Sequence, residues 1–351
     1  MGSETVKQIN LALQGGGSHG ALTWGVLDRL LEDERLEIAE ISGTSAGAMN
    51  AVVLADGLER GGRDGARAAL EEFWRAISRA ALFSPLQRSP LDRMLGRWSL
   101  DMSPGYLFAE GMSRIFSPYQ LNPMGVNPLR NVLEAHVDFD NVNTCRKINV
   151  HVTATHVKTG RARIFSRGAV GLDAVMASAC LPQLYPAVEI DGEAYWDGGF
   201  SANPALMPLV TSTVCPDIVI VQINPIVRHD VPTSAREIIN RVNEISFNTA
   251  LIKELRTIAL MQRIIAEQGV DLGAAGQTYV HLIHTDEEVQ DLAASSKLNA
   301  EWAYLTKLRE RGRGWAQAWL DAHFDKIGCD SSFDINGFFD DPAPGEPGCG
   351  R

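Results

Sequence analysis

The sequence has few cysteines, and their spacing provides no metal or disulfide framework. Five cysteines are spread over 351 residues, and none stands in a CxxC pair or beside a histidine at a zinc-ligand spacing. An odd, sparse set is typical of reduced thiols in a cytosolic protein. We therefore expect no structural zinc and no disulfide scaffold, and no spacing typical of a calcium loop is present.

Positive charge is also scarce. Lysine and arginine number 32 against 43 aspartates and glutamates, so the formal net charge is -11. Affinity for nucleic acid comes from clustered Lys and Arg, and the composition therefore argues against a nucleic-acid partner. The same acidity weakens attraction to anionic bilayers, which leaves peripheral contact with a membrane open.

Long apolar runs are missing as well. No run approaches the ~20 residues that a membrane-spanning helix needs. The run at 8–13 is too short for a secretory signal and ends in glycines. We expect a soluble, cytoplasmic protein, and 45% hydrophobic residues suffice for one large core or two smaller ones.

Two strand-to-helix junctions are present at the start of the chain. The apolar run 8–13 leads into the glycines of 15–17, and helical spacing begins after Gly20. A second run, 38–41, ends in the turn 43–47, which a small-residue helix follows. This alternation predicts an α/β fold with a largely parallel central sheet flanked by helices.

The remaining chain is assigned from periodicity and proline content. We predict strands at 148–155, 162–165, 185–190 and 217–223, and helices at 64–79 (exposed), 170–176, 232–266 and 299–324. Residues 81–128 combine prolines with Met and aromatic side chains, which predicts an inserted helical cap. Such a cap is either a mobile lid over a pocket or an embellishment packed on the core.

No repeat or linker divides the chain. We expect a catalytic domain over residues 8–225, with the cap at 81–128, and a helical extension at 226–327 packed on the same domain. The amphipathic pattern at 251–265 favours core packing and leaves subunit pairing or membrane contact open. A Gly- and Pro-rich tail from 328 to 351 is predicted to be disordered.

Gly43-Thr44-Ser45-Ala46-Gly47 matches G-x-S-x-G. In this pattern a serine occupies a strained strand-to-helix turn that projects its hydroxyl at a helix N-terminus. The pattern also occurs by chance as a plain turn. Because a short strand precedes it here and a small-residue helix follows, Ser45 is the candidate nucleophile.

The earlier glycine turn has two interpretations. Backbone N–H groups at such a turn bind a phosphate, or they stabilise the oxyanion of an acyl transfer. G-x-G-x-x-G is also the dinucleotide fingerprint, which expects an acid at the end of the next strand. That strand runs into the Ser45 turn instead, which favours an oxyanion hole. The block consists of Gly15, Gly16, Gly17, Ser18, His19 and Gly20.

Asp197 lies between an aromatic pair and two glycines in Tyr195-Trp196-Asp197-Gly198-Gly199. A serine nucleophile needs a positioned base, and burial in an apolar pocket would raise the pKa of an aspartate toward that task. Asp-Gly-Gly alone is an ordinary turn. A Ser-His-Asp triad would instead need a late histidine, and no candidate has a distinctive neighbourhood. These candidates are His229, His281, His284 and His323.

The blocks GGGSHG, GTSAG and WDGG, in this order and with ASACLP at 177–182, resemble the patatin-like phospholipases over residues 8–225. The resemblance implies an α/β fold and cofactor-free hydrolysis of phospholipid, lysophospholipid or glyceride esters by a Ser-Asp dyad. It implies Ser45 as nucleophile and Asp197 as base. The implied oxyanion hole comprises the amides of Gly15, Gly16, Gly17 and Ala46. Gly20, Gly43, Gly47, Gly198 and Gly199 are implied to shape the turns.

One position departs from that family. Its first block usually has Arg or Lys where this chain has His19. A permanent cation there would stabilise the oxyanion or hold the loop, whereas imidazole is mostly neutral at pH 7. Two alternatives to an active hydrolase stay open: a lipid-binding protein whose catalysis has decayed, and a nucleotide-binding regulatory protein. Self-association into a homo-oligomer is open too.

Overall fold

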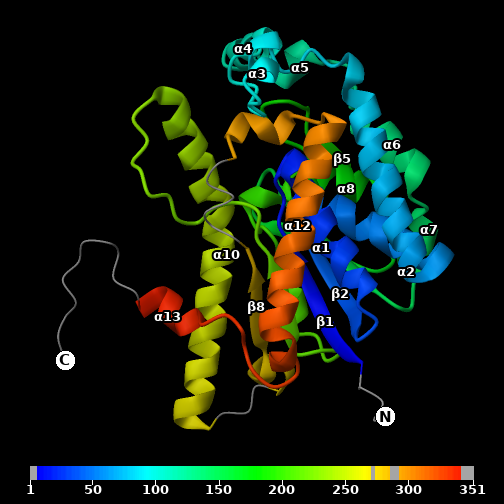
Figure 1. Ribbon diagram of the computed structural model, residues 1–351, viewed down its shortest axis with the longest axis vertical. Coiled ribbons are helices and arrows are strands. Elements are labelled where there is room, and N and C mark those ends of the chain that lie inside the picture. Colours follow the sequence, from blue (N-terminus) through cyan, green and yellow to red (C-terminus); the bar gives the residue numbers. More distant parts are fainter. Residues whose placement is uncertain (1–5, 270–272, 285–291, 341–351) are drawn as a thin grey trace.

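The computed structural model describes residues 6–269, 273–284 and 292–340. Within these residues one eight-stranded sheet lies between layers of helices (Figure 1). The strand order is β5-β6-β3-β2-β1-β7-β8, and β4 also pairs with β3. The strands are β1 (Lys7–Leu13), β2 (Leu36–Thr44), β3 (Asn149–His156), β4 (Ala162–Phe165), β5 (Val188–Ile190), β6 (Glu193–Asp197), β7 (Asp217–Val221) and β8 (Tyr279–Ile283).

The centre of the sheet is parallel and one side is antiparallel. β1 pairs in parallel with β2 and β7, β2 with β3, and β7 with β8. β4 and β6 run antiparallel to β3, and β5 runs antiparallel to β6. The predicted α/β fold with a largely parallel sheet is confirmed. Because Leu13 pairs with Gly43, the loops that follow β1 and β2 lie side by side.

Helices cover both faces of this sheet (Figure 1). The long ones are α1 (Gly20–Glu32), α2 (Ala46–Ala80), α10 (Ala235–Gln268) and α12 (Trp302–His323). Shorter ones are α3 (Pro90–Met94), α4 (Pro104–Ser113), α5 (Pro118–Leu121), α6 (Pro128–His136), α7 (Phe139–Thr144), α8 (Leu172–Ser178), α9 (Met207–Val210) and α13 (Ile335–Asp340). Two 3-10 turns matter for the site, η1 (Gly17–His19) and η5 (Ala294–Leu298).

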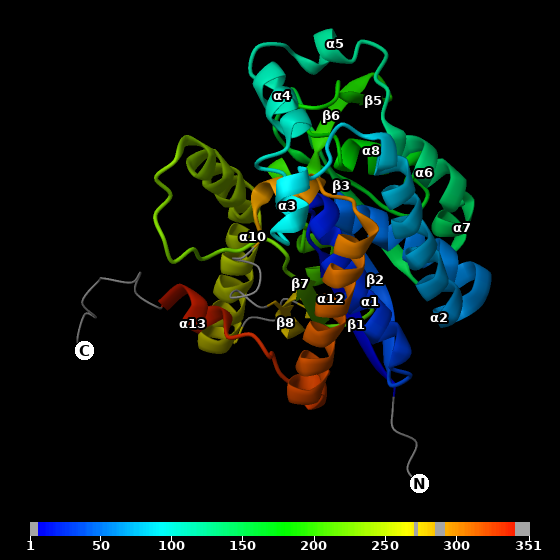
Figure 2. The same cartoon turned by 45° about the horizontal axis from the view of Figure 1, so that its top comes forward.

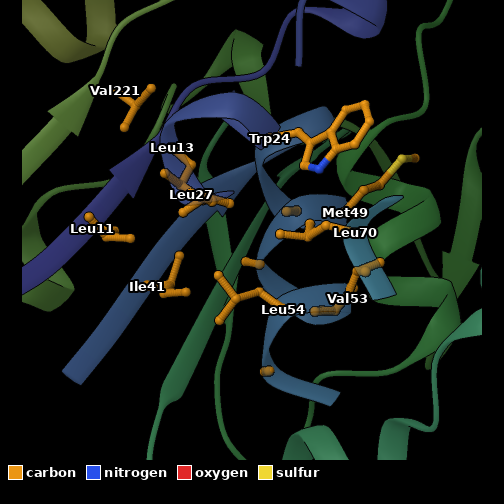
Figure 3. Packing of buried hydrophobic residues seen from close by; sticks show 14 of the residues in the cluster. Leu11, Leu13, Trp24, Leu27, Ile41, Met49, Val53, Leu54, Leu70 and Val221 are labelled. Atoms are coloured by element: carbon orange, nitrogen blue, oxygen red, sulfur yellow. The ribbon is translucent and has the colours of Figure 1, made fainter. Parts of the chain in front are cut away.

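Alternation along β1 separates two hydrophobic clusters. Ile9, Leu11 and Leu13 lie in the larger cluster with side chains of α1, α2 and α12, and Figure 3 shows Leu11 and Leu13 near labelled residues of α1 and α2. Ala12 points the other way, into a second cluster with side chains of α10. The apolar face predicted at 251–265 therefore packs in the core, on the opposite face of the sheet.

The predicted exposed helix at 64–79 proves to be half buried. It is the second part of α2, which breaks at Gly61 and Gly62, where the backbone angles are non-helical. Leu70, Phe73 and Trp74 of this part lie in the larger cluster. The many charged residues on the outer face lead to the prediction of an exposed helix. The apolar residues recur at helical spacing on the other face, and this face packs on the first half of the domain.

The tail predicted from Gly328 is ordered over its first residues. The Gly328 N–H donates to an Asp217 carboxylate oxygen at 2.8 Å, and Ile335 of α13 is buried beside α10. This hydrogen bond and the burial of Ile335 fix the start of the tail to the domain, although its Gly- and Pro-rich composition predicts disorder. Residues 341–351 lie outside the described part of the chain.

Residues 81–128 form a group of short helices, α3 to α5, at the end of the molecule where the cyan ribbon lies (Figures 1 and 2). This cap is attached to the start of α12: Arg88 pairs with Glu301 at 2.6 Å, and Trp98 stacks on Tyr304. α4 buries none of its residues. Among the described helices, none is both long and apolar enough to cross a bilayer.

Candidate active site

Ser45 occupies a strained turn between β2 and α2. Its φ of 54° and ψ of -121° lie in a region that non-glycine residues rarely adopt. The Ser45 N–H donates to the Ser178 hydroxyl at 2.8 Å, which supports this conformation. Ser45 is only partly buried, while the other residues of the turn are buried. The backbone thus presents a single serine at the N-terminus of a helix, as G-x-S-x-G predicts.

The glycines allow the loops after β1 and β2 to pack closely on each other. A Cβ on Gly15 would lie 2.7 Å from the Ser45 Cβ, so only glycine allows this approach. A Cβ on Gly47 would lie 2.2 Å from a main-chain oxygen at the end of β1. Gly20 and Gly43 pack just as closely on residues of the serine turn. The two sequence blocks therefore form one site.

The backbone amides of this site differ in availability. The Gly15 N–H already donates to Asn203 Oδ1 at 2.7 Å. Within the described residues, the amides of Gly16 and Gly17 have no hydrogen-bond acceptor. Ala46 is the first residue of α2, where helical N–H groups are left without an intrahelical acceptor. Of the four predicted amides, that of Gly15 is therefore engaged, and those of Gly16, Gly17 and Ala46 have no acceptor within the described residues.

Asp197 reaches Ser45 because β6 ends beside β3. Asp197 pairs with Ala154 of β3, and the chain then turns across β3, where a Cβ on Gly198 would lie 2.1 Å from a main-chain oxygen. The Asp197 carboxylate accepts a hydrogen bond from the Gly199 N–H at 2.7 Å, and the Ser45 hydroxyl lies close enough to lower its pKa. The predicted nucleophile and base thus lie beside each other.

Burial changes the pKa of Asp197. The side chain is 2% exposed, and this desolvation raises its pKa to about 7. Hydrogen bonds from Gly199 and Ser45 and the charge of Lys297 oppose the rise without cancelling it. A carboxylate with a pKa near the working pH is a far better base than one at its ordinary value.

The histidines do not complete a triad. His281 lies on β8 with Nε2 at 3.0 Å from Asp217 and Nδ1 at 3.0 Å from the Ser332 hydroxyl. Asp217 begins β7, whereas Ser45 follows the end of β2, so this cluster lies at the opposite end of the parallel strands. In the part of the chain that the structure describes, no histidine hydrogen-bonds to Ser45 or Asp197.

His19, the departure noted in the glycine block, is buried and interacts with η5. Its Nε2 lies 2.8 Å from the Ser296 hydroxyl of η5. Burial, with smaller effects of Lys297 and Arg228, lowers the His19 pKa well below its ordinary value. The ring is therefore neutral at pH 7. Ser18 beside it is also buried.

A buried amide network behind the glycine loop escapes sequence analysis. Gln14 Oε1 accepts from the backbone N–H groups of residues 223 and 224, each at 3.0 Å. The Asn224 side chain donates to the Gly15 carbonyl at 2.7 Å. Gln14 and Asn224 follow the carboxyl ends of the neighbouring parallel strands β1 and β7. Sites in such sheets lie at this edge, so the position of the two amides after predicted strands was the signal that could have found them.

The fold and the site define an α/β protein with a serine turn, a buried carboxylate beside it and a glycine-rich loop with two amides that have no acceptor within the described residues. Residues 11–210 match the family model of the patatin-like phospholipases, and the chain belongs to this family. The predicted resemblance is confirmed, and membership supports lipid hydrolysis as the class of activity. No curated protein is significantly similar to the chain in sequence.

Similar solved structures are distant. VipD from Legionella pneumophila is 15% identical with a TM-score of 0.40, and the match covers 91% of this chain and 67% of VipD. ExoU in complex with SpcU, from the type III secretion system of Pseudomonas aeruginosa, is 14% identical with a TM-score of 0.28. That match covers 89% of this chain and 53% of the ExoU chain, so this chain spans about half of ExoU.

Proposed function

We propose that the protein is a serine acyl hydrolase that cleaves carboxylic esters of lipids through a dyad of Ser45 and Asp197. The observation that carries the proposal is the position of Ser45, in a strained turn, beside the buried Asp197 carboxylate, whose pKa is raised to about 7. A nucleophile next to such a base is the arrangement that acyl transfer requires. Patatin-like family membership makes a lipid ester the expected substrate.

In the proposed reaction the substrate carbonyl carbon lies against Ser45 Oγ. Asp197 takes the hydroxyl proton as the oxygen attacks, and the carbonyl oxygen becomes an oxyanion bound by the amides of Gly16, Gly17 and Ala46. Collapse of this intermediate transfers the proton to the leaving alcohol. A water deprotonated by the same carboxylate then hydrolyses the acyl-enzyme and regenerates Ser45.

We also propose that the cap meets the lipid surface from which the substrate comes. Residues 91–126 expose large apolar side chains, including Met94 (77% exposed), Phe108 (70%) and Met124 (86%). Three acids and three arginines lie between 90 and 127, a net charge of zero in a chain of -11. A neutral apolar face can therefore approach a bilayer that the rest of the surface would not favour.

The dyad is tested with p-nitrophenyl esters of increasing acyl length. We expect Ser45→Ala and Asp197→Asn each to lower kcat by about a thousandfold or more, because nucleophile and base act as a unit. Ser246→Ala and Asp64→Asn remove the same groups at exposed positions and should leave turnover unchanged. Wild-type activity that survives in Ser45→Ala would rule the mechanism out.

The same samples discriminate the alternatives. A nucleotide-binding protein would not cleave the esters, and its melting temperature would rise with added dinucleotide. A lipid-binding protein without catalysis would retain fatty acid or phospholipid and show no turnover. A hydrolase gives ester turnover and no dinucleotide effect on the melting temperature.

A further inference from the structure

η5 crosses the glycine loop from outside the segment that matches the family model, which ends at residue 210. The Lys297 main-chain oxygen lies so close to Gly17 that a Cβ there would be 2.5 Å from it. Gly17 itself has a φ of 58°, the left-handed conformation that favours glycine. Lys297 is thus fixed to the loop that bears the proposed oxyanion donors.

The Lys297 side chain reaches the same loop by a second route. Its Nζ donates to Asn224 Oδ1 at 2.8 Å. Asn224 is 2% exposed, and its Nδ2 donates to the Gly15 carbonyl at 2.7 Å. A charged donor therefore orients a buried amide, and this amide holds the glycine that packs on Ser45. Charge-assisted hydrogen bonds of this kind are the stronger ones in proteins.

Charged groups from several elements surround the ammonium. Glu244 of α10 is bound by Arg228 at 2.6 Å and by Arg241 at 3.2 Å. Burial lowers the pKa of Lys297, Glu244 and Asp197 raise it, and Arg228 lowers it further. In return Lys297 opposes the burial-driven rise in the pKa of Asp197.

We propose that Lys297 is a positioning residue of the hydrolase site, which holds the Gly15–Gly17 loop through Asn224 and places a positive charge beside the reacting groups. This inference rests on the proposed dyad. During attack, negative charge moves from Asp197 to the oxyanion, and a fixed cation on the glycine loop, whose field reaches Asp197, favours the ionised base and the transition state. The neutral imidazole of His19 cannot supply that charge.

The experiment compares Lys297→Met, which keeps the length of the stem, with Lys297→Arg, which keeps the charge. For Lys297→Met we expect kcat for a p-nitrophenyl ester to fall on the order of tenfold, less than the ~100-fold typical of losing an oxyanion donor itself, with KM nearly unchanged. The rising limb of its pH–rate profile should move to higher pH. For Lys297→Arg the rising limb should stay at the same pH as in the wild type.

Lys253→Met is the matched control, because Lys253 is exposed on α10. Melting temperatures ensure that all rates are measured on folded protein. A wild-type kcat and an unmoved pH limb in Lys297→Met would overturn the inference. So would an equal loss in Lys297→Met and Lys297→Arg with no shift of the limb in either. If Ser45→Ala also stays active, the dyad itself fails, which is a separate result.

Discussion

At the scale of single residues, Asp197 is under two opposing requirements. In the proposed mechanism its carboxylate must be ionised to accept the Ser45 proton, yet it is buried, and burial disfavours the charge. The charged or titratable groups that face it are Lys297, which favours ionisation, and the Cys180 thiol, whose own pKa burial raises to about 11. The thiol is therefore neutral wherever Asp197 titrates.

The first prediction at this scale concerns activity. Because only ionised Asp197 accepts a proton, kcat/KM for a water-soluble ester should rise with pH, reach half its maximum near pH 7 and then level off. Rates between about pH 5 and about pH 9 test this. A profile that is flat, or already complete near pH 5, would contradict Asp197 as the base.

The second prediction concerns stability. Unfolding returns Asp197 from a pKa of about 7 to an ordinary value of 3.8, so the folded state holds the proton more tightly. This tighter proton binding stabilises the folded state fully below about pH 4, and the stabilisation is lost as the pH rises toward about 7. Asp197→Asn has no such loss. Above pH 7 it should be more stable than wild type by on the order of 2–4 kcal/mol.

Urea unfolding near pH 5 and near pH 8 measures this difference. The stability gap between Asp197→Asn and wild type should widen with pH, whereas Asp64→Asn, at a 97% exposed carboxylate, should show no widening. A gap of the same size at both values would mean that Asp197 is not a destabilised buried charge.

At the scale of elements, α1 and α12 cross in unusually close contact. A Cβ on Gly25 would lie 1.9 Å from the Arg309 carbonyl oxygen, and one on Gly312 would lie 1.9 Å from the Leu22 carbonyl oxygen. The two glycines face each other's helix, and both views show these helices side by side (Figures 1 and 2). This crossing joins the segment that follows the glycine loop to the segment that follows η5.

Gly312→Ala should therefore destabilise the protein by about 1–3 kcal/mol, because the added methyl forces two helix backbones apart. Gly314→Ala is the control on the same helix. Gly314 is exposed with open space around it, so alanine should be neutral or stabilise by about 0.5–1 kcal/mol through helix propensity. Equal effects of the two variants in urea unfolding would show that the crossing tolerates a side chain.

Elements also differ in how far the sequence predicts them. β1 and β7 are apolar, buried runs and are found close to their expected bounds. β6 (Glu193–Asp197) is not expected, because its side chains are mixed and only partly buried at the antiparallel side of the sheet. β6 nevertheless ends in Asp197. The WDGG block can therefore be recognised in the sequence even though the strand that contains its aspartate is not predicted.

At the scale of the whole molecule, the cap leaves an apolar face uncovered. Contact of this face with a lipid surface predicts that Phe108→Ser with Met124→Ser weakens binding to phosphatidylcholine vesicles by about tenfold or more, since each large apolar side chain contributes about 1.5–3 kcal/mol when removed from water. Cleavage of a water-soluble ester should be unchanged, because neither residue is part of the dyad.

Vesicle co-sedimentation and ester kinetics on the same preparations test this. Val231→Ser is the control, because Val231 is 83% exposed but lies outside the cap. If the double variant binds vesicles as well as wild type does, the cap is not the lipid-facing surface. If it loses soluble-ester turnover as well, its effect is on the site and not on docking.

The sequence by itself determined the α/β class and the family, and it predicted Ser45 and Asp197 as the dyad, because these depend on local patterns: alternating apolar runs and glycine turns of fixed length. Only the tertiary structure decided which amides stay free, how far burial raises the pKa of Asp197, and that Lys297 meets the glycine loop. Those properties arise between segments up to 280 positions apart, such as Gly17 and Lys297. No local pattern encodes such a distance, because packing of the whole chain sets it.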